Sequence, residues 1–272
     1  MKFEFIKNIL STLFVFSGSL FYLSCSENDI VATPVTGLIK ISEGYAIGAA
    51  TKVEIWANEE LFAGYNAVQL ALYDSLTGKA LTEAHIEINP IMQMENMSHS
   101  CPVEQPGQYA VNKLFPAAIL FTMPSGDMGN WSMEIRITNH ITEYFGKALL
   151  AIHVKSTAPS KVISFQTASG ARYYLSYQFP GQPKVGMNVF EVIVYTLKDE
   201  KFIPAEDLAI HMTPEMPAMD HGSPNNEDPV HTANGHYEGK VNFTMTGEWR
   251  LHLELRDRSP VIGSKYFDTV VN

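Results

Sequence analysis

Two segments of the chain are rich in the sulfur and nitrogen atoms that can bind a metal ion. The candidate ligands are, in chain order, Met94, Met97, His99 and Cys101 in the first segment, and Met216, Met219 and His221 in the second. Thioether, imidazole and thiolate donors suit soft Cu(I), whereas Mg²⁺ and Ca²⁺ prefer carboxylate and carbonyl oxygen. The two segments therefore predict copper binding, with Cu(I) favoured.

The spacing within the segments favours the same interpretation. If the first segment is extended, Met97, His99 and Cys101 occupy alternate positions, so that three soft donors lie on one face. Met219 and His221 repeat the first two of these positions in the second segment. Thioethers do not form disulfides, so a methionine-rich site also suits an oxidising compartment.

Core packing is the competing interpretation of the same residues. Methionine fills irregular gaps in apolar cores, and a methionine loop could close the open end of a β-sandwich without binding metal. Met123, Met133 and Met245 occupy alternate positions that predict core packing. Cys101 could be a small buried apolar residue, or it could pair with another chain. His211, His231 and His236 lie near the second segment in sequence and are further candidates.

The segments belong to two copies of one longer pattern. Pro90 and His99 of the first copy match Pro214 and His221 of the second. Further along, Gly129-Asn130-Trp131 matches Gly247-Glu248-Trp249, in the same order. Several matches in one order indicate an internal repeat. We place the first domain at residues 34–157 and the second at residues 158–272.

Each copy has the hydrophobic pattern of β-strands. From Trp249 to Arg256 the odd positions are apolar and the even positions polar, which is the period of a half-buried strand. The β-branched and aromatic run from Val189 to Leu197 is typical of a central strand. Short strands separated by Gly, Pro and Asn turns predict an all-β fold with two immunoglobulin-like antiparallel β-sandwiches in tandem, of about seven strands each.

The N-terminal residues have the features of a lipoprotein export signal. Lys2 and Lys7 precede an apolar stretch that ends at Ser24-Cys25. Tyr22-Leu23-Ser24-Cys25 resembles a bacterial lipobox, which implies a signal peptide at residues 1–24 and lipid on Cys25. Residues 25–33 would then form the lipidated Cys and an acidic tether. We expect a protein anchored to the membrane through Cys25, periplasmic or exposed on the cell surface. An ordinary signal peptide or a signal anchor is the alternative.

Composition and motifs exclude several functional classes. Lys and Arg number 19 and Asp and Glu 29, and a net charge of −10 disfavours binding to nucleic-acid phosphates. Two cysteines cannot form a disulfide scaffold or a four-cysteine zinc site. The sequence contains no G-x-S-x-G elbow, P-loop, dinucleotide fingerprint or H-E-x-x-H motif. We therefore expect no catalytic activity.

The second copy resembles a known family of small domains. The resemblance rests on the stretches from Pro214 to Gly222, from Gly235 to Gly239 and from Phe243 to Trp249. They are similar to the YtkA/FixH-like domain, a small extracytoplasmic β-sandwich, several members of which are associated with copper handling or with assembly of copper-containing oxidases. The first copy is diverged, with Ser100 in place of Gly222 and an added cysteine.

Two functions are compatible with this resemblance. It implies a cell-envelope lipoprotein that binds copper for delivery, storage or sensing, with a copper-receiving or other envelope protein as its partner. The alternative is a metal-free extracytoplasmic module that binds a protein or a glycan, or that assists assembly, through its loops.

Overall fold

The computed structural model describes residues 37–272 except residue 141. The expected signal peptide, Cys25 and the tether lie outside the described residues. The described residues belong to one compact unit. The described residues form strands, turns and irregular segments, and none of them belongs to a helix that could cross a membrane.

The described strands fall into two groups, separated by residues 153–161. The first group comprises β1 (Ile39–Ala46), β2 (Thr51–Ala57), β3 (Gly64–Asp74), β4 (Ala84–Gln93), β5 (Ser98–His99), β6 (Val103–Glu104), β7 (Phe115–Phe121), β8 (Asn130–Asn139) and β9 (Tyr144–Ile152). The second group comprises β10 (Val162–Gln166), β11 (Arg172–Gln178), β12 (Gly186–Lys198), β13 (Lys201–Pro204), β14 (Leu208–Met216), β15 (His221–Gly222), β16 (Glu227–Ala233), β17 (His236–Phe243), β18 (Gly247–Asp257) and β19 (Val261–Val271).

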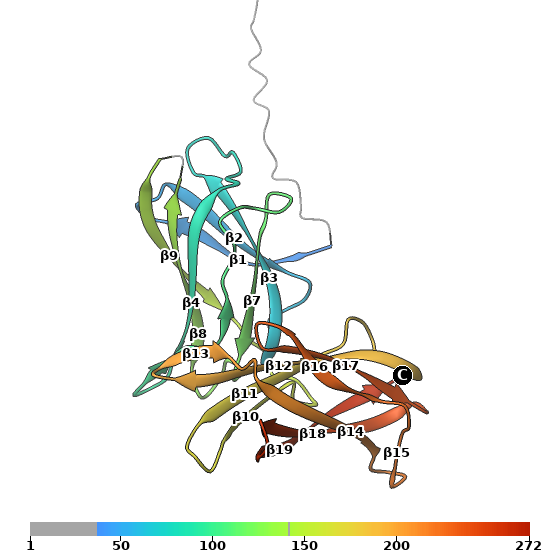
Figure 1. Cartoon of the computed structure of the whole chain (residues 1–272). Coiled ribbons are helices and arrows are strands. Elements are labelled where there is room, and N and C mark those ends of the chain that lie inside the picture. Colours follow the sequence, from blue (N-terminus) through green and yellow to red (C-terminus); the bar gives the residue numbers. More distant parts are fainter. Residues whose placement is uncertain (1–36, 141) are drawn as a thin grey trace, which may run out of the picture. The chain divides into compact units, whose positions relative to one another are not determined.

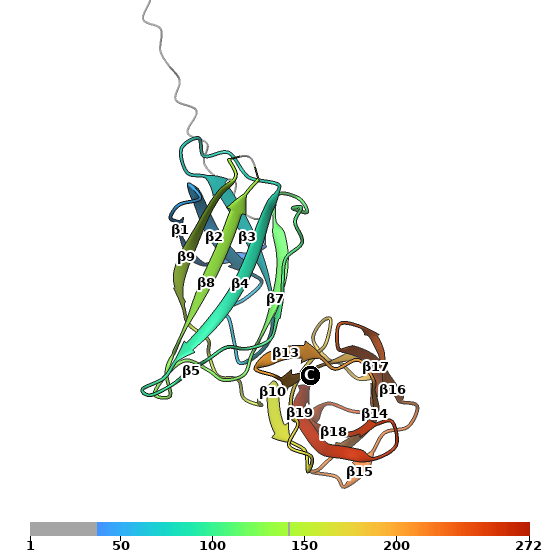
Figure 2. The same ribbon diagram turned by 60° about the vertical axis from the view of Figure 1, so that its left-hand side comes forward.

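Each group of strands forms two antiparallel sheets (Figures 1 and 2). In the first sandwich the sheet orders are β1-β2-β3-β7-β6 and β5-β4-β8-β9. In the second they are β10-β11-β12-β17-β16 and β15-β14-β18-β19. The strand order is the same in both, apart from β13, which pairs with β12 in the second sandwich. The prediction of an all-β fold with two antiparallel sandwiches is confirmed.

Alternation in the sequence sets which side chains enter each core. In β18 the buried side chains are Trp249, Leu251, Leu253 and Leu255, and their neighbours in the chain are half-buried or exposed. The central position predicted for Val189 to Leu197 is also confirmed, because β12 lies between β11 and β17. A strand paired on both edges and covered by a second sheet needs the β-branched residues found there.

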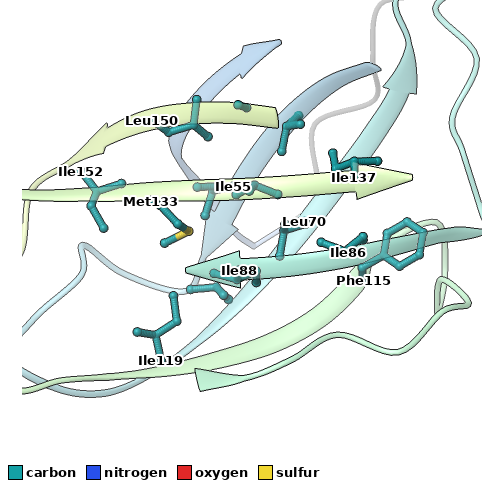
Figure 3. Packing of buried hydrophobic residues seen from close by; sticks show 14 of the residues in the cluster. Ile55, Leu70, Ile86, Ile88, Phe115, Ile119, Met133, Ile137, Leu150 and Ile152 are labelled. Carbon is teal, nitrogen blue, oxygen red and sulfur yellow. The ribbon is translucent and has the colours of Figure 1, made fainter. Parts of the chain in front are cut away.

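The first core lies between its two sheets (Figure 3). Ile86 and Ile88 of β4 and Met133 and Ile137 of β8 point toward Ile55 of β2 in the facing sheet. The second core is organised around Trp249, Phe243 and Tyr237, all fully buried.

Two of the three methionines expected in the cores are buried or partly buried. Met133 is fully buried, and Met123 is partly buried against the first core. The expectation for Met245 is wrong, because that side chain is 38% exposed. The reason is that β17 ends at Phe243, so Met245 lies in the turn before β18 and no longer follows the strand alternation.

Candidate metal centre at two equivalent hairpins

The second donor segment folds into a short β-hairpin at the end of the second sandwich. Strand β14 ends at Met216, strand β15 begins at His221, and these two residues are direct partners in the antiparallel ladder. Between them the Met219 N–H donates to the Met216 carbonyl oxygen at 3.0 Å. Asp220 closes the turn at φ 50°, in the left-handed region that aspartate tolerates. The hairpin thus places one thioether and one imidazole opposite each other.

Met216 and His221 lie on the face of the hairpin that meets the core. Met216 is 5% exposed and belongs to the second core. Residues directly opposite in an antiparallel pair share a face, so His221 lies on that side too. Its ring packs edge-on against Trp249, with centroids 5.8 Å apart and planes at 76°. The Trp249 indole N–H donates to the Met245 carbonyl at 3.0 Å, which fixes the indole at this end of the sandwich.

The hydrogen bond made by His221 leaves one ring nitrogen available. Nδ1 lies 2.8 Å from the carbonyl oxygen of Gly222. A carbonyl only accepts, so Nδ1 donates in this bond, and Nε2 is the ring nitrogen that the neutral tautomer offers to a metal ion. An imidazole held by a backbone carbonyl through one nitrogen and binding metal through the other is a common arrangement in metal sites.

Met219 lies at the exposed tip of the hairpin. Its side chain is 59% exposed, whereas Met216 is in the core. The turn links the two methionines through the backbone bond described above, and their sulfurs lie in different environments. A site using all three residues therefore needs the Met219 side chain to fold back over the hairpin toward His221.

The first sandwich has a hairpin with the same plan. His99 on β5 is the direct partner of Met92 on β4. The His99 ring packs edge-on against Trp131 at 5.6 Å and 88°, and its Nδ1 lies 3.1 Å from the Ser100 carbonyl. The Trp131 indole N–H donates to the Met123 carbonyl at 2.9 Å. Methionine, histidine and tryptophan therefore meet in the same way in both sandwiches.

Among the first-segment methionines, Met92 occupies the position of Met216. Met92 is fully buried, Met94 is half-buried against the core, and Met97 is 62% exposed at the tip. Met92 belongs to the same methionine-rich loop in the sequence but is not among the predicted ligands Met94, Met97, His99 and Cys101. The match of Pro90 to Pro214 contained the necessary signal, since Met92 and Met216 each lie two residues after that proline.

Cys101 lies inside the first core. It is 2% exposed, and burial raises the pKa of its thiol well above the ordinary range. The thiolate is the form that binds metal or attacks a disulfide. A protonated thiol in this position acts as a small apolar core residue, so a site at the first hairpin rests on the thioethers and His99.

The further histidine candidates contact residues other than those of the second hairpin. His211 lies on the outer face of β14, where Nδ1 is 2.8 Å from a carboxylate oxygen of Asp228. His231 packs against the ring of Tyr237 at 5.2 Å. His236 binds two carboxylates and is described below. Across the part of the chain that the structure describes, no three or more His, Cys, Asp or Glu side chains are placed to hold a metal ion. The donors at the hairpins are therefore thioethers with one imidazole each.

Comparison with known proteins supports part of the sequence interpretation. A family model described as YtkA-like matches residues 167–254, which include the second hairpin and Trp249. None of the curated proteins compared with the chain matches it.

The chain also matches solved structures at low identity. Domains 5–6 of the S-layer protein SbsC cover 86% of this chain and 98% of their own, at 10% identity and a TM-score of 0.31. The Escherichia coli adhesin FdeC covers 84% and 66%, at 13% identity and a TM-score of 0.27. A structure titled pT26-6p covers 86% and 65%, at 7% identity and a TM-score of 0.28.

Proposed function

We propose that this chain is a cell-envelope lipoprotein that binds copper, as Cu(I), at its two hairpins. Delivery of the ion to an envelope protein, storage or sensing would be its role. The YtkA-like match over residues 167–254 supports an envelope protein, and the donor set supports the metal.

The observation that carries the proposal is the pairing of Met216 with His221 beside Trp249. Packing of a buried methionine does not require a histidine on the neighbouring strand. A histidine at the surface likewise does not require a methionine as its partner. The first sandwich has the same pairing of Met92 with His99 beside Trp131. In both hairpins the histidine Nδ1 hydrogen-bonds a backbone carbonyl, so Nε2 is the nitrogen that could bind the metal ion.

The residues of the second hairpin fit Cu(I) by their chemistry. Met216, Met219 and His221 would hold the ion with two thioethers and one imidazole, a soft set with no charge to attract Mg²⁺ or Ca²⁺. In the first hairpin Met92 and His99 would act with Met94 or Met97. The buried indole beside each histidine excludes water from one side, which favours a weakly hydrated monovalent ion. Copper bound there would supply an exchangeable ion.

Competition with a chromophoric Cu(I) chelator tests the proposal. The protein is a soluble chain that begins at Ser26 and keeps the whole compact unit. Met216→Leu, Met219→Leu and His221→Gln are combined, because leucine is close to methionine in volume and carries no sulfur donor. We expect the parent to take copper from the chelator and the triple variant to lose at least tenfold in affinity at that site.

A matched control uses soft donors outside the hairpins. Met128 and Met187 are 63% and 44% exposed, and His211 is exposed on the outer face of β14. Met128→Leu, Met187→Leu and His211→Gln should leave the affinity unchanged. Failure of the parent to compete, or an equal loss in the control, would reject the copper site and favour the metal-free binding module.

Lipidation is tested separately in the full-length chain. Cys25→Ser should abolish incorporation of a labelled fatty acid and move the protein from the detergent phase to the aqueous phase. Retention of the label in the variant would place the lipid elsewhere and contradict the lipoprotein assignment.

A further inference from the structure

His236 on β17 bridges two carboxylates from different sandwiches. Its Nε2 lies 2.7 Å from Oε1 of Glu104, on β6 of the first sandwich. Its Nδ1 lies 2.8 Å from Oε1 of Glu191, on β12 of the second. We call these three residues the His236 bridge. Carboxylates accept hydrogen bonds, so both ring nitrogens donate at once only when the imidazole is protonated.

The His236 bridge is largely shielded from water. The side chains of His236, Glu104 and Glu191 are 14%, 27% and 23% exposed. The Tyr65 ring of the first sandwich meets the imidazole edge-on at 5.3 Å. Tyr195 of the second sandwich donates its hydroxyl to Glu104 at 3.3 Å. The Tyr65 hydroxyl also hydrogen-bonds Glu104, and the Gln178 side-chain amide donates to Glu191.

Uncharged contacts surround the bridge. Leu120 of the first sandwich packs in one buried cluster with Tyr174, Ile193 and Tyr195 of the second. The Tyr65 N–H donates to the hydroxyl of Ser176 at 3.0 Å. Burial raises the pKa of the Tyr65 and Tyr195 hydroxyls above the ordinary 10, so both stay protonated over the range in which His236 loses its proton.

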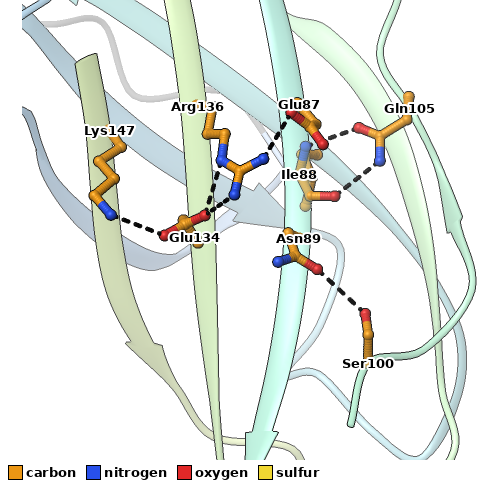
Figure 4. A network of polar contacts seen from close by, with 8 residues as sticks. All are labelled: Glu87, Ile88, Asn89, Ser100, Gln105, Glu134, Arg136 and Lys147. Atoms are coloured by element: carbon orange, nitrogen blue, oxygen red, sulfur yellow. Dashed lines mark hydrogen bonds and ion pairs between the residues drawn. The ribbon is translucent and has the colours of Figure 1, made fainter.

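The first sandwich holds Glu104 in place through its neighbour in sequence. The Gln105 side chain accepts from the Ile88 N–H and donates to the Ile88 carbonyl, both at 2.8 Å (Figure 4). A side-chain amide here replaces a strand partner and fixes the segment along β4. Glu104 is also paired in the ladder with Ala118 of β7. The contacts with β4 and β7 therefore hold Glu104 in place where it meets His236.

We propose that the positive charge of His236 holds the two sandwiches in contact, and that loss of its proton loosens that contact. The physical reason is the arrangement of charge. Two partly buried carboxylates face one another with the imidazolium between them, and removing one partner of a buried ion group leaves charge uncompensated. With a neutral imidazole, Glu104 and Glu191 repel each other and lose one of the two hydrogen bonds.

The pKa of His236 gives the pH range of this effect. Burial alone would lower this pKa, but the hydrogen bonds to Glu104 and Glu191 outweigh it and raise it to about 9. Because the folded pKa lies above the ordinary 6.5, the contribution is complete below pH 6.5 and is lost as the pH rises through about 9. Burial raises the pKa of Glu191, but the hydrogen bonds from His236 and Gln178 outweigh burial and hold this pKa below the ordinary 4.5. Glu191 therefore becomes protonated only in acid below that value.

Distance measurement between spin labels tests the proposal. Labels are placed by Leu76→Cys on the first sandwich and Ala168→Cys on the second, both exposed, in the chain that begins at Ser26. Cys101 is buried and stays unlabelled. We expect one narrow distance distribution at pH 6.5 and a clearly broader one at pH 10. Equal distributions at the two pH values would overturn the proposal.

Variants separate the charge of His236 from other effects of pH. His236→Gln should give the broad distribution at both pH values, whereas His211→Gln, which removes an exposed contact with Asp228, should behave like the parent. Thermal unfolding of both variants shows whether the sandwiches themselves remain folded.

Glu104→Gln provides a second, independent readout. The imidazole titration of His236, followed by NMR, should shift from about 9 toward 6.5 by at least one pH unit. An unchanged titration would mean that Glu104 does not contact His236 in solution, and would also overturn the proposal.

Discussion

Met216 lies directly opposite His221 across the β14–β15 hairpin, and the pair is repeated by Met92 and His99 in the first sandwich. Each pair lies against a buried tryptophan whose indole N–H is held by a backbone carbonyl. In each pair the methionine packs in the core, and the histidine has one ring nitrogen that does not contact the backbone carbonyl. Substitutions can therefore separate the structural role of each residue from its role as a ligand.

Substitution of Met216 should show its structural role. Because it is 5% exposed, Met216→Ala leaves a cavity and should lower the free energy of unfolding by about 2–5 kcal/mol. Met216→Leu keeps the volume and should cost less than about 1.5 kcal/mol. Urea unfolding of the chain beginning at Ser26 measures both. Met219→Ala is the control, and its 59% exposed side chain should change stability by less than about 0.5 kcal/mol.

Substitution of the glycine that lies two residues before each buried tryptophan should destabilise the two sandwiches to different extents. Gly129 and Gly247 have φ of 149° and 126°, which strains any other residue. A Cβ at Gly129 would lie 2.4 Å from the backbone oxygen of Gln93, whereas one at Gly247 would meet the flexible end of Met216 at 2.7 Å. Gly129→Ala should therefore be the more destabilising, by about 2 kcal/mol or more.

The chemical denaturation of both variants measures this difference. Gly186→Ala is the matched control, because its φ is 102° and no atom lies within 4 Å of the added Cβ. The control reports the cost of the backbone conformation alone. A smaller loss for Gly129→Ala than for Gly186→Ala would contradict the close approach of Gln93.

Stability in acid should depend on Glu54 of β2. This carboxylate is 1% exposed and lies 2.9 Å from the ammonium groups of both Lys40 and Lys52. Burial raises its pKa, but the bonds from the two lysines outweigh burial and hold the pKa below the ordinary 4.5. Its contribution is thus present above pH 4.5 and is lost as the pH falls through the folded value.

Glu54→Gln should lower the free energy of unfolding at pH 7 by about 1–3 kcal/mol, because it removes two charge-assisted bonds at a buried position. The difference from the parent should shrink steadily below pH 4. Glu43, whose bonds to Lys40 and Lys52 lower its pKa to about 2, is half-exposed and is the comparison. Glu43→Gln should cost less at pH 7. A constant difference between parent and Glu54→Gln down to pH 2 would contradict the assignment.

Cys101 should be unreactive in the folded protein. It is the single thiol in the chain beginning at Ser26, and burial raises its pKa. A thiol reagent such as Ellman's should react at a rate limited by local opening, and non-reducing gels should show monomer. Cys101→Ala should cost less stability than Cys101→Ser, which buries a hydroxyl. Rapid labelling of the native chain would place Cys101 on the surface.

Local patterns in the sequence determined the secondary structure and the class of fold. Alternation from Trp249 to Leu255 depends only on successive side chains pointing to opposite faces, so the pattern identifies a half-buried strand without knowledge of its neighbours. The recurrence of methionine, histidine and tryptophan in one order likewise located the two donor segments. Met245 marks the limit of this reasoning, because alternation does not show where a strand ends.

Tertiary structure decided which residues meet. The sequence placed Met94 and Met97 among the candidate ligands, but strand register pairs His99 with Met92. Burial of Cys101 depends on the facing sheet. The bond between Glu104 and His236 joins residues 132 positions apart and has no local signal. Periodicity fixes the face on which a side chain lies, whereas its partner across strands or between sandwiches depends on register and packing, which the assembled chain alone sets.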